Sequence, residues 1–358
     1  MRQLLFLLLA PAAFAQVDPF ANLDTNKDGK LSASELPKEA RPFLSMVDGN
    51  ADGFVTREEF QQVAANFLTP PPSQAPDASG LKNLDYAGNG NVRQTLDVYL
   101  PESPSNKKVP LVIYIHGGGW MSGDKSHGRS IAELITSTGD YAAASINYRL
   151  SQHALWPAQI HDCKAAVRYL RANAEKYGID PERIAVMGHS AGGHLAAMLG
   201  TTNKERSLEG KVGPYPSQSS EVQCVVNFFG PTDFETFFGK DIDLAKLSRE
   251  NMAIRLLGQN EEEIRKNARL ASPIHWISKD DAPVFTSHGT ADRLVPFAQA
   301  EELDAALKEA GVESHLVAMQ GAGHGFSSDE LNQRIKSFLD LHLRQIPGKI
   351  SDAPISAR

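Results

Sequence analysis

Residues 183–200 read RIAVMGHSAGGHLAAMLG, in which an apolar run, a tight glycine-bounded turn and a second apolar run follow one another. The run RIAVM is typical of a buried strand, and GHLAAMLG has the small and apolar side chains of a buried helix. Between them, residues 188–192 match the G-x-S-x-G pattern, in which a sharp strand-to-helix turn exposes a serine hydroxyl. The pattern predicts that Ser190 is a nucleophile, and the alternative is an ordinary strand-to-helix turn.

Strand and helix patterns alternate on both sides of this stretch. Strands are expected at 92–100, 109–115, 142–147, 183–187, 223–229, 284–288 and 314–319, and helices at 159–174, 192–200, 297–310 and 331–343. This alternation predicts the α/β class, with a doubly wound and mostly parallel sheet. The functional side chains of such sheets lie at the carboxyl ends of the strands.

A serine hydroxyl reacts only when a base removes its proton, and two later segments offer the groups needed. His324 lies in the glycine-rich sequence GAGHGF, and Asp292 lies in HGTADRLVP after a predicted strand. We expect His324 to act as the general base and Asp292 to hold its tautomer. The alternatives are a solvent-exposed loop histidine and a simple turn aspartate.

The sequence HGGGW directly follows the predicted strand that ends in LVIYI. Successive glycines allow backbone N–H groups to approach a developing oxyanion, and we expect Gly118, Gly119 and Ala191 to form this oxyanion hole. His116 is expected to fix the loop through hydrogen bonds. Trp120 is expected either to line the acyl side of the site or to cover the core. The alternative for the whole segment is a structural glycine-rich loop.

Two segments near the N-terminus match the twelve-residue EF-hand loop and resemble that family. The expected oxygen ligands are Asp24, Asn26, Asp28, Lys30 through its carbonyl and Glu35 in the first loop, and Asp48, Asn50, Asp52, Phe54 through its carbonyl and Glu59 in the second. Leu31 and Val55 occupy the same loop position and are expected to pair in a short two-stranded contact. The tandem match predicts a calcium-binding module at 16–68, and the alternative is a pair of polar turns without affinity.

The two EF-hand loops are spaced more closely than in the usual pair. A single short helix near 34–46, interrupted by Pro37 and Pro42, must serve both loops. We therefore expect calcium to stabilise this module rather than to open it. Dockerins also carry two closely spaced loops and bind a scaffold protein, so docking is an alternative, although dockerin loops usually end in Asp and these end in Glu.

The sequence begins MRQLLFLLLAPAAFAQ, with a basic residue, a short apolar run and a small-x-small site. This is typical of a secretory signal at 1–15 and predicts a secreted or periplasmic protein, the alternative being an N-terminal anchor. Residues 69–80 read TPPPSQAPDASG and are expected to form a linker. Residues 346–358 are expected to form a tail.

The charge and the cysteines exclude other classes. The 358 residues include 43 Asp and Glu against 36 Lys and Arg, a net charge of −7 that disfavours nucleic-acid binding. No nucleotide-binding loop or zinc spacing is found, and no membrane partner is expected. Cys163 and Cys224 are expected to be separately buried thiols, with a disulfide between them as the alternative.

Residues 81–345 resemble α/β-hydrolase esterases of the hormone-sensitive-lipase-like and the acetyl/feruloyl carbohydrate esterase groups. The motifs HGGGW, INYRLS, PAQIHD, GHSAGGHLA, GTADRLVP and GAGHGF occur in the family's order. His189 stands where the hormone-sensitive-lipase group often has Asp, which favours the carbohydrate-esterase and formamidase-like branches. The resemblance implies that the family's site residues fall at Ser190, Asp292, His324, Gly118 and Gly119.

Together these features predict a secreted serine carboxylic-ester hydrolase that works through an acyl-enzyme and needs no cofactor for catalysis. The expected substrates are short acyl (acetyl) or aryl esters, including esters on carbohydrates. The segment 234–272 is expected to form a small helical cap, and such a cap suggests an open cleft that admits an ester on a bulky alcohol. The alternatives are a formamidase or exopeptidase-like acyl hydrolase, and a calcium-dependent binding protein built on a hydrolase scaffold. Oligomeric state and natural ester are not predicted.

Overall fold

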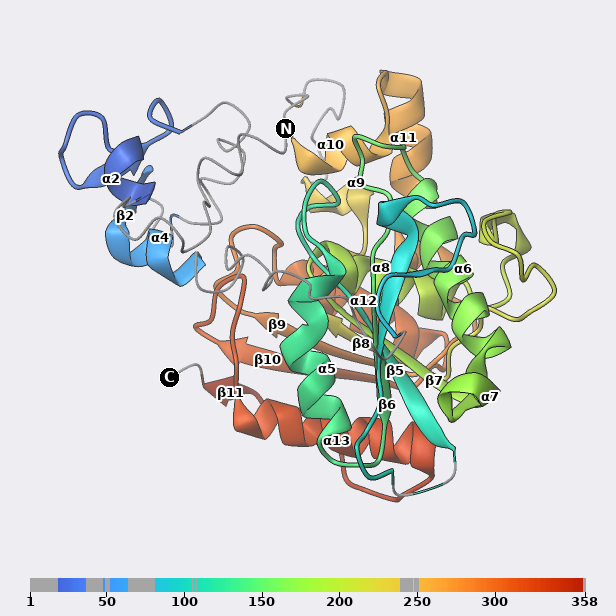
Figure 1. Cartoon of the computed structure of the whole chain (residues 1–358). Helices are drawn as coiled ribbons and strands as arrows, with labels where there is room; N and C mark the ends of the chain where they lie inside the picture. Colours follow the sequence, from blue (N-terminus) through green and yellow to red (C-terminus); the bar gives the residue numbers. More distant parts are fainter. Residues whose placement is uncertain are drawn as a thin grey trace. The chain divides into compact units, whose positions relative to one another are not determined.

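The computed structural model describes residues 19–36, 48, 52–63, 81–104, 106, 108–238, 247 and 251–356. The chain divides into two units, Met1–Pro76 and Asp77–Arg358, which are described separately (Figure 1). The predicted signal segment 1–15, the linker 69–80 and the predicted ligand Asn50 lie outside the described residues.

The described part of the N-terminal unit contains two short strands and two helices. Their bounds are α2 Pro19–Leu23, β1 Lys30–Ser32, β2 Phe54–Thr56 and α4 Arg57–Val63. The strands pair antiparallel with Leu31 opposite Val55, which confirms the predicted contact between the two loops. Both side chains are buried, and they form a small apolar core with Phe20 and Leu36.

A twisted sheet forms the centre of the second unit. Its described strands are β3 Leu84–Asp85, β4 Thr95–Tyr99, β5 Val109–Ile115, β6 Ala142–Ile146, β7 Ile179–His189, β8 Cys224–Phe228, β9 Val284–Gly289, β10 Ser314–Gln320 and β11 Ile355–Ser356. They are ordered β11-β10-β9-β8-β7-β5-β6-β4-β3. Pairing is parallel from β11 to β6, whereas β4 is antiparallel to both of its neighbours. The predicted α/β class with a mostly parallel sheet is confirmed.

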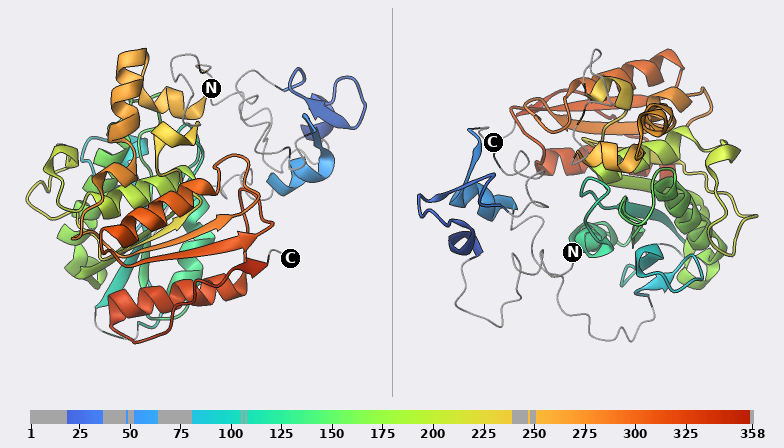
Figure 2. Two further views of the ribbon diagram at one scale, coloured as in Figure 1. Left: turned by 180° about the vertical axis from the view of Figure 1, so that it is seen from behind. Right: turned by 90° about the horizontal axis from the view of Figure 1, so that it is seen from above.

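Helices cover both faces of the sheet (Figure 2). The described α-helices of this unit are α5 Arg129–Thr136, α6 Ala158–Ala172, α7 Ala174–Tyr177, α8 Ala191–Thr201, α9 Phe234–Phe237, α10 Met252–Leu257, α11 Glu261–Leu270, α12 Ala298–Glu309 and α13 Asp329–Arg344, and its described 3-10 turns are η3 Val92–Gln94, η4 Lys125–Gly128, η5 Arg206–Leu208 and η7 Pro273–Trp276. Apolar residues of α6, α8 and α12 pack on one face, and those of α13 and α5 pack on the other. No helix in the described part of the chain is both long and apolar enough to cross a bilayer.

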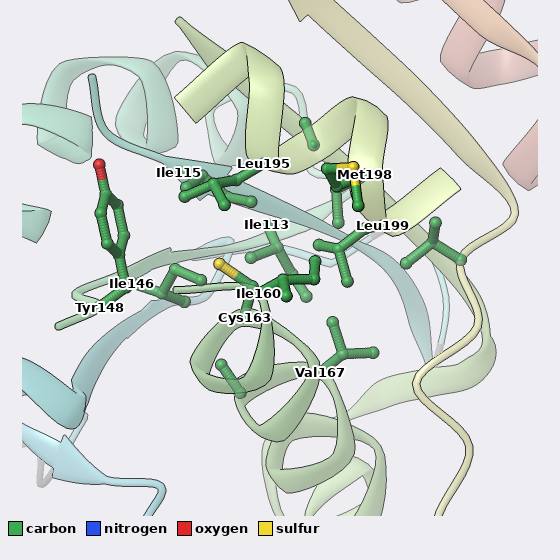
Figure 3. Packing of buried hydrophobic residues seen from close by; sticks show 14 of the residues in the cluster. Ile113, Ile115, Ile146, Tyr148, Ile160, Cys163, Val167, Leu195, Met198 and Leu199 are labelled. Atoms are coloured by element: carbon green, nitrogen blue, oxygen red, sulfur yellow. The ribbon is translucent and has the colours of Figure 1, made fainter. Parts of the chain in front are cut away.

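Alternation along β5 explains how one strand serves two cores. Ile113 and Ile115 face the cluster that contains α6 and α8, while Val112 and Tyr114 face the cluster that contains α13. Successive strand residues point to opposite faces, so a strand buried on both sides is continuously apolar. Figure 3 shows the first cluster, where the isoleucines of β5 meet Leu195 and other side chains of α8.

Cys163 and Cys224 are both buried and free. Cys163 lies in α6 and belongs to the apolar cluster that this helix forms with one face of the sheet. Cys224 belongs to the cluster on the opposite face. The expectation of two separate thiols is confirmed, because the sheet lies between them.

The structure differs from the predicted elements mainly at their ends and at short elements. Residues 92–94, predicted as the start of a strand, form the 3-10 turn η3, because the Asn91 side chain accepts a hydrogen bond from Arg93 N and caps the turn. The short strand β11 pairs parallel with β10, so the sheet continues into the segment 346–358 that was expected to be a tail. A strand of two residues carries no detectable periodicity, which explains why it was missed.

The predicted cap segment, 234–272, is helical in its described part. It contributes α9, α10 and α11 between β8 and β9, and Figure 1 shows α10 and α11 together at one end of the sheet. The backbone N–H of Trp156 donates to the carbonyl of Leu256 at 2.9 Å, which fixes the end of α10 to the main body of the unit. Residues 239–246 and 248–250 lie outside the described residues.

The first turn of α8 approaches β5 so closely that only glycine fits at position 192. A Cβ there would contact the carbonyl oxygen of Ile115, and it would lie 2.7 Å from the carbonyl oxygen of His116. Both neighbours are backbone atoms and cannot rotate away. This approach brings the carboxyl end of β5 against the turn that carries Ser190.

We expect Gly192→Ala to lower the free energy of unfolding by about 3 kcal/mol or more, because the added methyl group must separate α8 from β5. Urea denaturation of the purified full chain measures this change. Gly348→Ala is the control, since its nearest neighbour would be the Ser337 Cβ at 3.8 Å, and a change within about 0.5 kcal/mol is expected there. Equal stability of the two variants would contradict the account.

Candidate active site

Ser190 lies at the turn between β7 and α8 with φ 55° and ψ −121°. A positive φ at a non-glycine residue costs about 1–3 kcal/mol and persists only where the surroundings impose it. Here the surroundings are hydrogen bonds: Ser190 N donates to the carbonyl of Phe228 at 2.9 Å, and His194 N donates to the carbonyl of Ser190 at 2.9 Å. Both backbone polar groups are therefore satisfied within the turn.

The structure brings together three side chains that are far apart in the sequence. His324, in the loop after β10, places Nε2 2.9 Å from Ser190 Oγ. Its other ring nitrogen, Nδ1, donates to Asp292 Oδ2 at 2.7 Å. This chain of hydrogen bonds has the geometry of a nucleophile, a base and an orienting carboxylate.

Asp292 is buried and is held by four donors. Its Oδ1 accepts from the backbone N–H groups of Leu294 and Val295, both at 2.9 Å, and Oδ2 also lies 3.2 Å from His288 Nε2. Burial alone would raise the pKa of Asp292, but the hydrogen bonds from His288 and His324 outweigh it and hold the pKa below its ordinary value. The carboxylate is therefore ionised when it orients His324.

His288 is a site residue that the sequence analysis missed. It is fully buried at the end of β9, and its Nε2 also donates to the carbonyl of Val295 at 2.8 Å. The residue stands four positions before Asp292, in the same segment HGTAD. This spacing could have indicated the role of His288, because residues at the end of a strand and in the loop that follows lie at the same edge of the sheet. His288 and Asp292 are therefore neighbours there.

The HGGGW loop has left-handed backbone at three successive residues. Gly118, Gly119 and Trp120 have φ of 106°, 57° and 57°. A Cβ at Gly118 would lie 2.6 Å from the Ser122 carbonyl oxygen. In the described residues, the N–H groups of Gly118, Gly119 and Ala191 donate to no protein acceptor, so they are available to an oxygen atom of a ligand.

His116 is buried, and both of its ring nitrogens and its carbonyl oxygen are hydrogen-bonded. Its Nδ1 donates to the Gly117 carbonyl at 2.7 Å, and its Nε2 accepts from Arg93 Nη2 at 3.2 Å. The Tyr148 hydroxyl donates to the His116 carbonyl at 3.0 Å. Burial, together with the charge of Arg93, lowers the pKa of His116 to about 3. A neutral His116 therefore holds the start of the loop, in the position predicted for it.

Trp120 is 4% exposed and belongs to the main apolar cluster. Its ring packs at 5.6 Å from the Phe234 ring, and its indole N–H donates to His194 Nδ1 at 3.1 Å. Of the two roles that the sequence left open, the structure favours the second, in which Trp120 covers the core.

Aromatic rings and one methionine surround the reacting groups, and the sequence analysis named only His189 among those described next. Phe229, which follows β8, has φ of 42° and packs its ring at 4.7 Å from the His324 ring. The His189 ring stacks on Phe228 at 4.2 Å, and burial lowers the pKa of His189 to about 4. Met252, the first residue of α10, contacts Gly119 so closely that a Cβ there would meet its Sδ. The surroundings of the site are thus largely apolar.

The two EF-hand loops show the same internal hydrogen bonds. The first-position carboxylates, Asp24 and Asp48, each accept two backbone N–H groups of their own loop at 2.8–3.1 Å. The last-position carboxylates accept from the ninth-position residues, Glu35 from Ser32 N and Glu59 from Thr56 N. The Ser32 hydrogen bonds lower the pKa of Glu35 to about 2, so this carboxylate is ionised.

These loops fit a calcium ion by chemistry and by fold. The predicted ligands are oxygen atoms, which calcium prefers, and the loop backbone already turns around the two first-position carboxylates. Each loop would hold its own ion. The ligands would be Asp24, Asn26, Asp28, Lys30 and Glu35 in the first loop, and Asp48, Asp52, Phe54 and Glu59 in the described part of the second. The charge of the ion would neutralise the clustered carboxylates.

One other group in the described residues has metal-ligand character. Ligand atoms of Asp233, Glu235 and His275 lie within 4.8 Å of one another. His275 Nε2 lies 2.9 Å from Glu235 Oε2, and Arg269 lies 3.5 Å from the same carboxylate. The Arg269 guanidinium lies beside one of the two carboxylates of this group.

Comparisons with known proteins agree with the fold and with the N-terminal loops. The family model BD-FAE matches residues 96–307, and the EF hand model matches residues 17–38 and 41–64. Esterase LipC of Mycobacterium tuberculosis (strain ATCC 25618 / H37Rv) is 30% identical over 271 residues, which are 72% of this chain and 64% of LipC.

Two solved structures are similar to about three quarters of the chain. One is a truncated form of a carbohydrate esterase from gut microbiota, with TM-score 0.64 and 32% identity, covering 76% of this chain and 99% of that chain. The other is Thermogutta terrifontis esterase 2 phosphonylated by sarin, with TM-score 0.61 and 26% identity, covering 76% of this chain and 99% of that chain.

The parallel sheet, the serine turn and these neighbours define an α/β-hydrolase fold with an N-terminal EF-hand segment, as predicted. The chain belongs to the BD-FAE family, whose model matches more than half of it. The chain spans 64% of LipC.

We expect Asp292→Asn to slow the phosphonylation of Ser190 by a fluorophosphonate by about 10⁴-fold, because an amide at this position favours the wrong tautomer of His324. The rate is measured by mass spectrometry of the intact protein. Asp329→Asn, an exposed change in the first turn of α13, is the control and is expected to react at the wild-type rate. A rate for Asp292→Asn within tenfold of wild type would contradict the assigned orientation.

Proposed function

We propose that this protein is a serine carboxylic-ester hydrolase that works through an acyl-enzyme. The observation that carries the proposal is the continuous hydrogen-bond chain from Ser190 Oγ through His324 to Asp292, at 2.9 and 2.7 Å. The family membership and the esterase relatives support it.

In the proposed mechanism, His324 Nε2 removes the proton from Ser190 Oγ as this oxygen attacks the ester carbonyl. The carbonyl π electrons move to oxygen, and the N–H groups of Gly118, Gly119 and Ala191 stabilise the resulting oxyanion. When the tetrahedral intermediate collapses, the ester C–O bond breaks and His324 returns its proton to the leaving alkoxide. A water molecule then repeats the sequence on the acyl-enzyme and releases the acid.

The proposed substrates are short acyl, chiefly acetyl, or aryl esters, including esters carried by carbohydrates. The contact of Met252 with Gly119 supports a short acyl group, because it places the cap helix α10 directly against the proposed oxyanion loop. The similar carbohydrate esterase supports a carbohydrate alcohol. The small size of the described cap helices, α9 to α11, agrees with a bulky leaving alcohol.

The N-terminal features complete the proposal. The apolar start of the sequence supports secretion or periplasmic location. The EF-hand match and the shared hydrogen bonds of its two loops support structural calcium binding. Docking of another protein through this module is a second proposal, carried by the close spacing of the loops.

Two alternatives keep the same fold but change the chemistry. A formamidase or exopeptidase-like enzyme would use the same three side chains on an amide. A calcium-dependent binding protein on a hydrolase scaffold would need none of them. The satisfied hydrogen bonds around Asp292 favour an enzyme, since a scaffold has no physical need to keep this carboxylate buried and ionised.

We expect Ser190→Ala to lower kcat on 4-nitrophenyl acetate by at least about 10⁴-fold, because the attacking oxygen is lost. The wild type is compared on 4-nitrophenyl acetate, longer acyl esters, acetylated xylan, methyl ferulate and a chromogenic amide. Ser207→Ala, at an exposed serine of η5, is the control with unchanged activity. Preference for long acyl chains or for the amide would contradict the proposed substrates, and absence of hydrolysis of every ester would contradict the enzyme.

We expect 1 mM calcium to stabilise the N-terminal unit by about 1.4 kcal/mol if its Kd is about 10⁻⁴ M, a value typical of extracellular sites. Calorimetry of the full chain with calcium and with chelator measures the shift. The double variant Glu35→Gln, Glu59→Gln should lose it, whereas Glu58→Gln, at an exposed residue, should keep it. Melting that is indifferent to chelator would show that the loops have no affinity.

A further inference from the structure

We infer that His194 is a positioning residue that couples the seating of the cap to the geometry of the oxyanion loop. This inference rests on the proposed function. Its side chain is fully buried in α8, and it bonds to the HGGGW loop with one ring nitrogen and to the cap with the other.

The first link reaches the oxyanion loop. The Trp120 indole N–H donates to His194 Nδ1 at 3.1 Å. Trp120 directly follows Gly119, and its own φ is 57°. A displaced Trp120 side chain would therefore rotate the peptide units on which the Gly118 and Gly119 N–H groups are carried.

The second link reaches the cap. His194 Nε2 donates to the carbonyl of Ala271 at 2.6 Å. Ala271 is the C-cap residue that follows α11, and it is buried. The position of the cap helix is thus transmitted to the ring that receives the Trp120 hydrogen bond.

The two links require one defined state of the imidazole. Nδ1 accepts and Nε2 donates, so the ring is neutral with its proton on Nε2. Burial lowers the pKa of His194 to about 4, which keeps it in this state near neutral pH. The rings of Trp120, Trp156 and Phe234 lie 5.2–5.6 Å away and hold the imidazole plane.

The backbone of the same residue serves the nucleophile. His194 N donates to the carbonyl of Ser190 at 2.9 Å and closes the first turn of α8. One residue therefore contacts the serine turn through its backbone, and the oxyanion loop and the cap through its side chain. Oxyanion donors stabilise the transition state only when they are placed within a few tenths of an ångström, so this coupling acts on kcat rather than on substrate binding.

Two variants separate the links. Asn places its Oδ1 near the position of Nδ1, so His194→Asn keeps the acceptor for Trp120 and loses the Ala271 bond. Gln places its amide near the position of Nε2, so His194→Gln keeps the Ala271 bond and loses the acceptor. We expect each of these two variants to lower kcat per titrated active site on 4-nitrophenyl acetate by about 10–100-fold. The KM of each variant is expected to stay within about threefold of the wild-type value.

A boronic acid reports on the same donors, because its tetrahedral adduct with Ser190 places an oxygen in the oxyanion position. Its inhibition constant is expected to rise in both variants by the factor by which kcat/KM falls. Trp120→Phe removes the indole N–H together with the five-membered part of the ring, and kcat is expected to fall as in His194→Gln, which keeps the test possible if a histidine variant does not fold. His342→Asn, at a half-buried histidine of α13 on the other face of the sheet, is the control with unchanged kcat.

The outcomes separate the inference from the proposed function. Wild type without ester hydrolysis would remove the proposed function itself. An active wild type with folded His194 variants of normal kcat per active site and normal boronic-acid affinity would overturn the inference. A lower melting temperature with unchanged kcat per active site would show that His194 is only structural, and this also overturns it.

Discussion

The carbonyl groups at the end of β5 lie directly against the Cα of Gly192 at the start of α8, and the rest of the site depends on this approach. Because β5 and β7 are adjacent and parallel, their carboxyl ends meet at one edge of the sheet. The loop after β5 supplies the glycine N–H groups, and the turn after β7 supplies Ser190. A larger residue at position 192 would separate the two halves before any chemistry could begin.

Buried histidines give this site its electrostatic character. Burial lowers the pKa of His116, His189 and His194, so these rings are neutral, and those of His116 and His194 act as fixed donors and acceptors. Asp292 is the opposite case, since its hydrogen bonds outweigh burial and keep it charged. A negative charge held beside an imidazole in an apolar surrounding is the arrangement that stabilises the imidazolium formed when a serine loses its proton.

Sequence patterns located the sheet and the reacting side chains because each coincides with a strong local signal. The G-x-S-x-G turn follows an apolar strand, and the glycine-rich segments around Gly118 and His324 follow others. The sequence did not reveal His288, Phe229 or Met252, because their contacts are made across elements that only the folded chain brings together. Short elements such as β11 escaped for the opposite reason, since two residues carry no period.

The central claim is that Ser190, activated by His324, carries the acyl group of an ester. Rapid acid quench of the full chain with 4-nitrophenyl acetate, followed by peptide mapping, tests it most directly. The account predicts a burst of 4-nitrophenol of one equivalent per active site and an acetyl group on the peptide that contains Ser190. An acetyl group found on another residue would contradict the claim. A His324→Ala variant that hydrolyses the ester at the wild-type rate without forming an acetyl-enzyme would also contradict it.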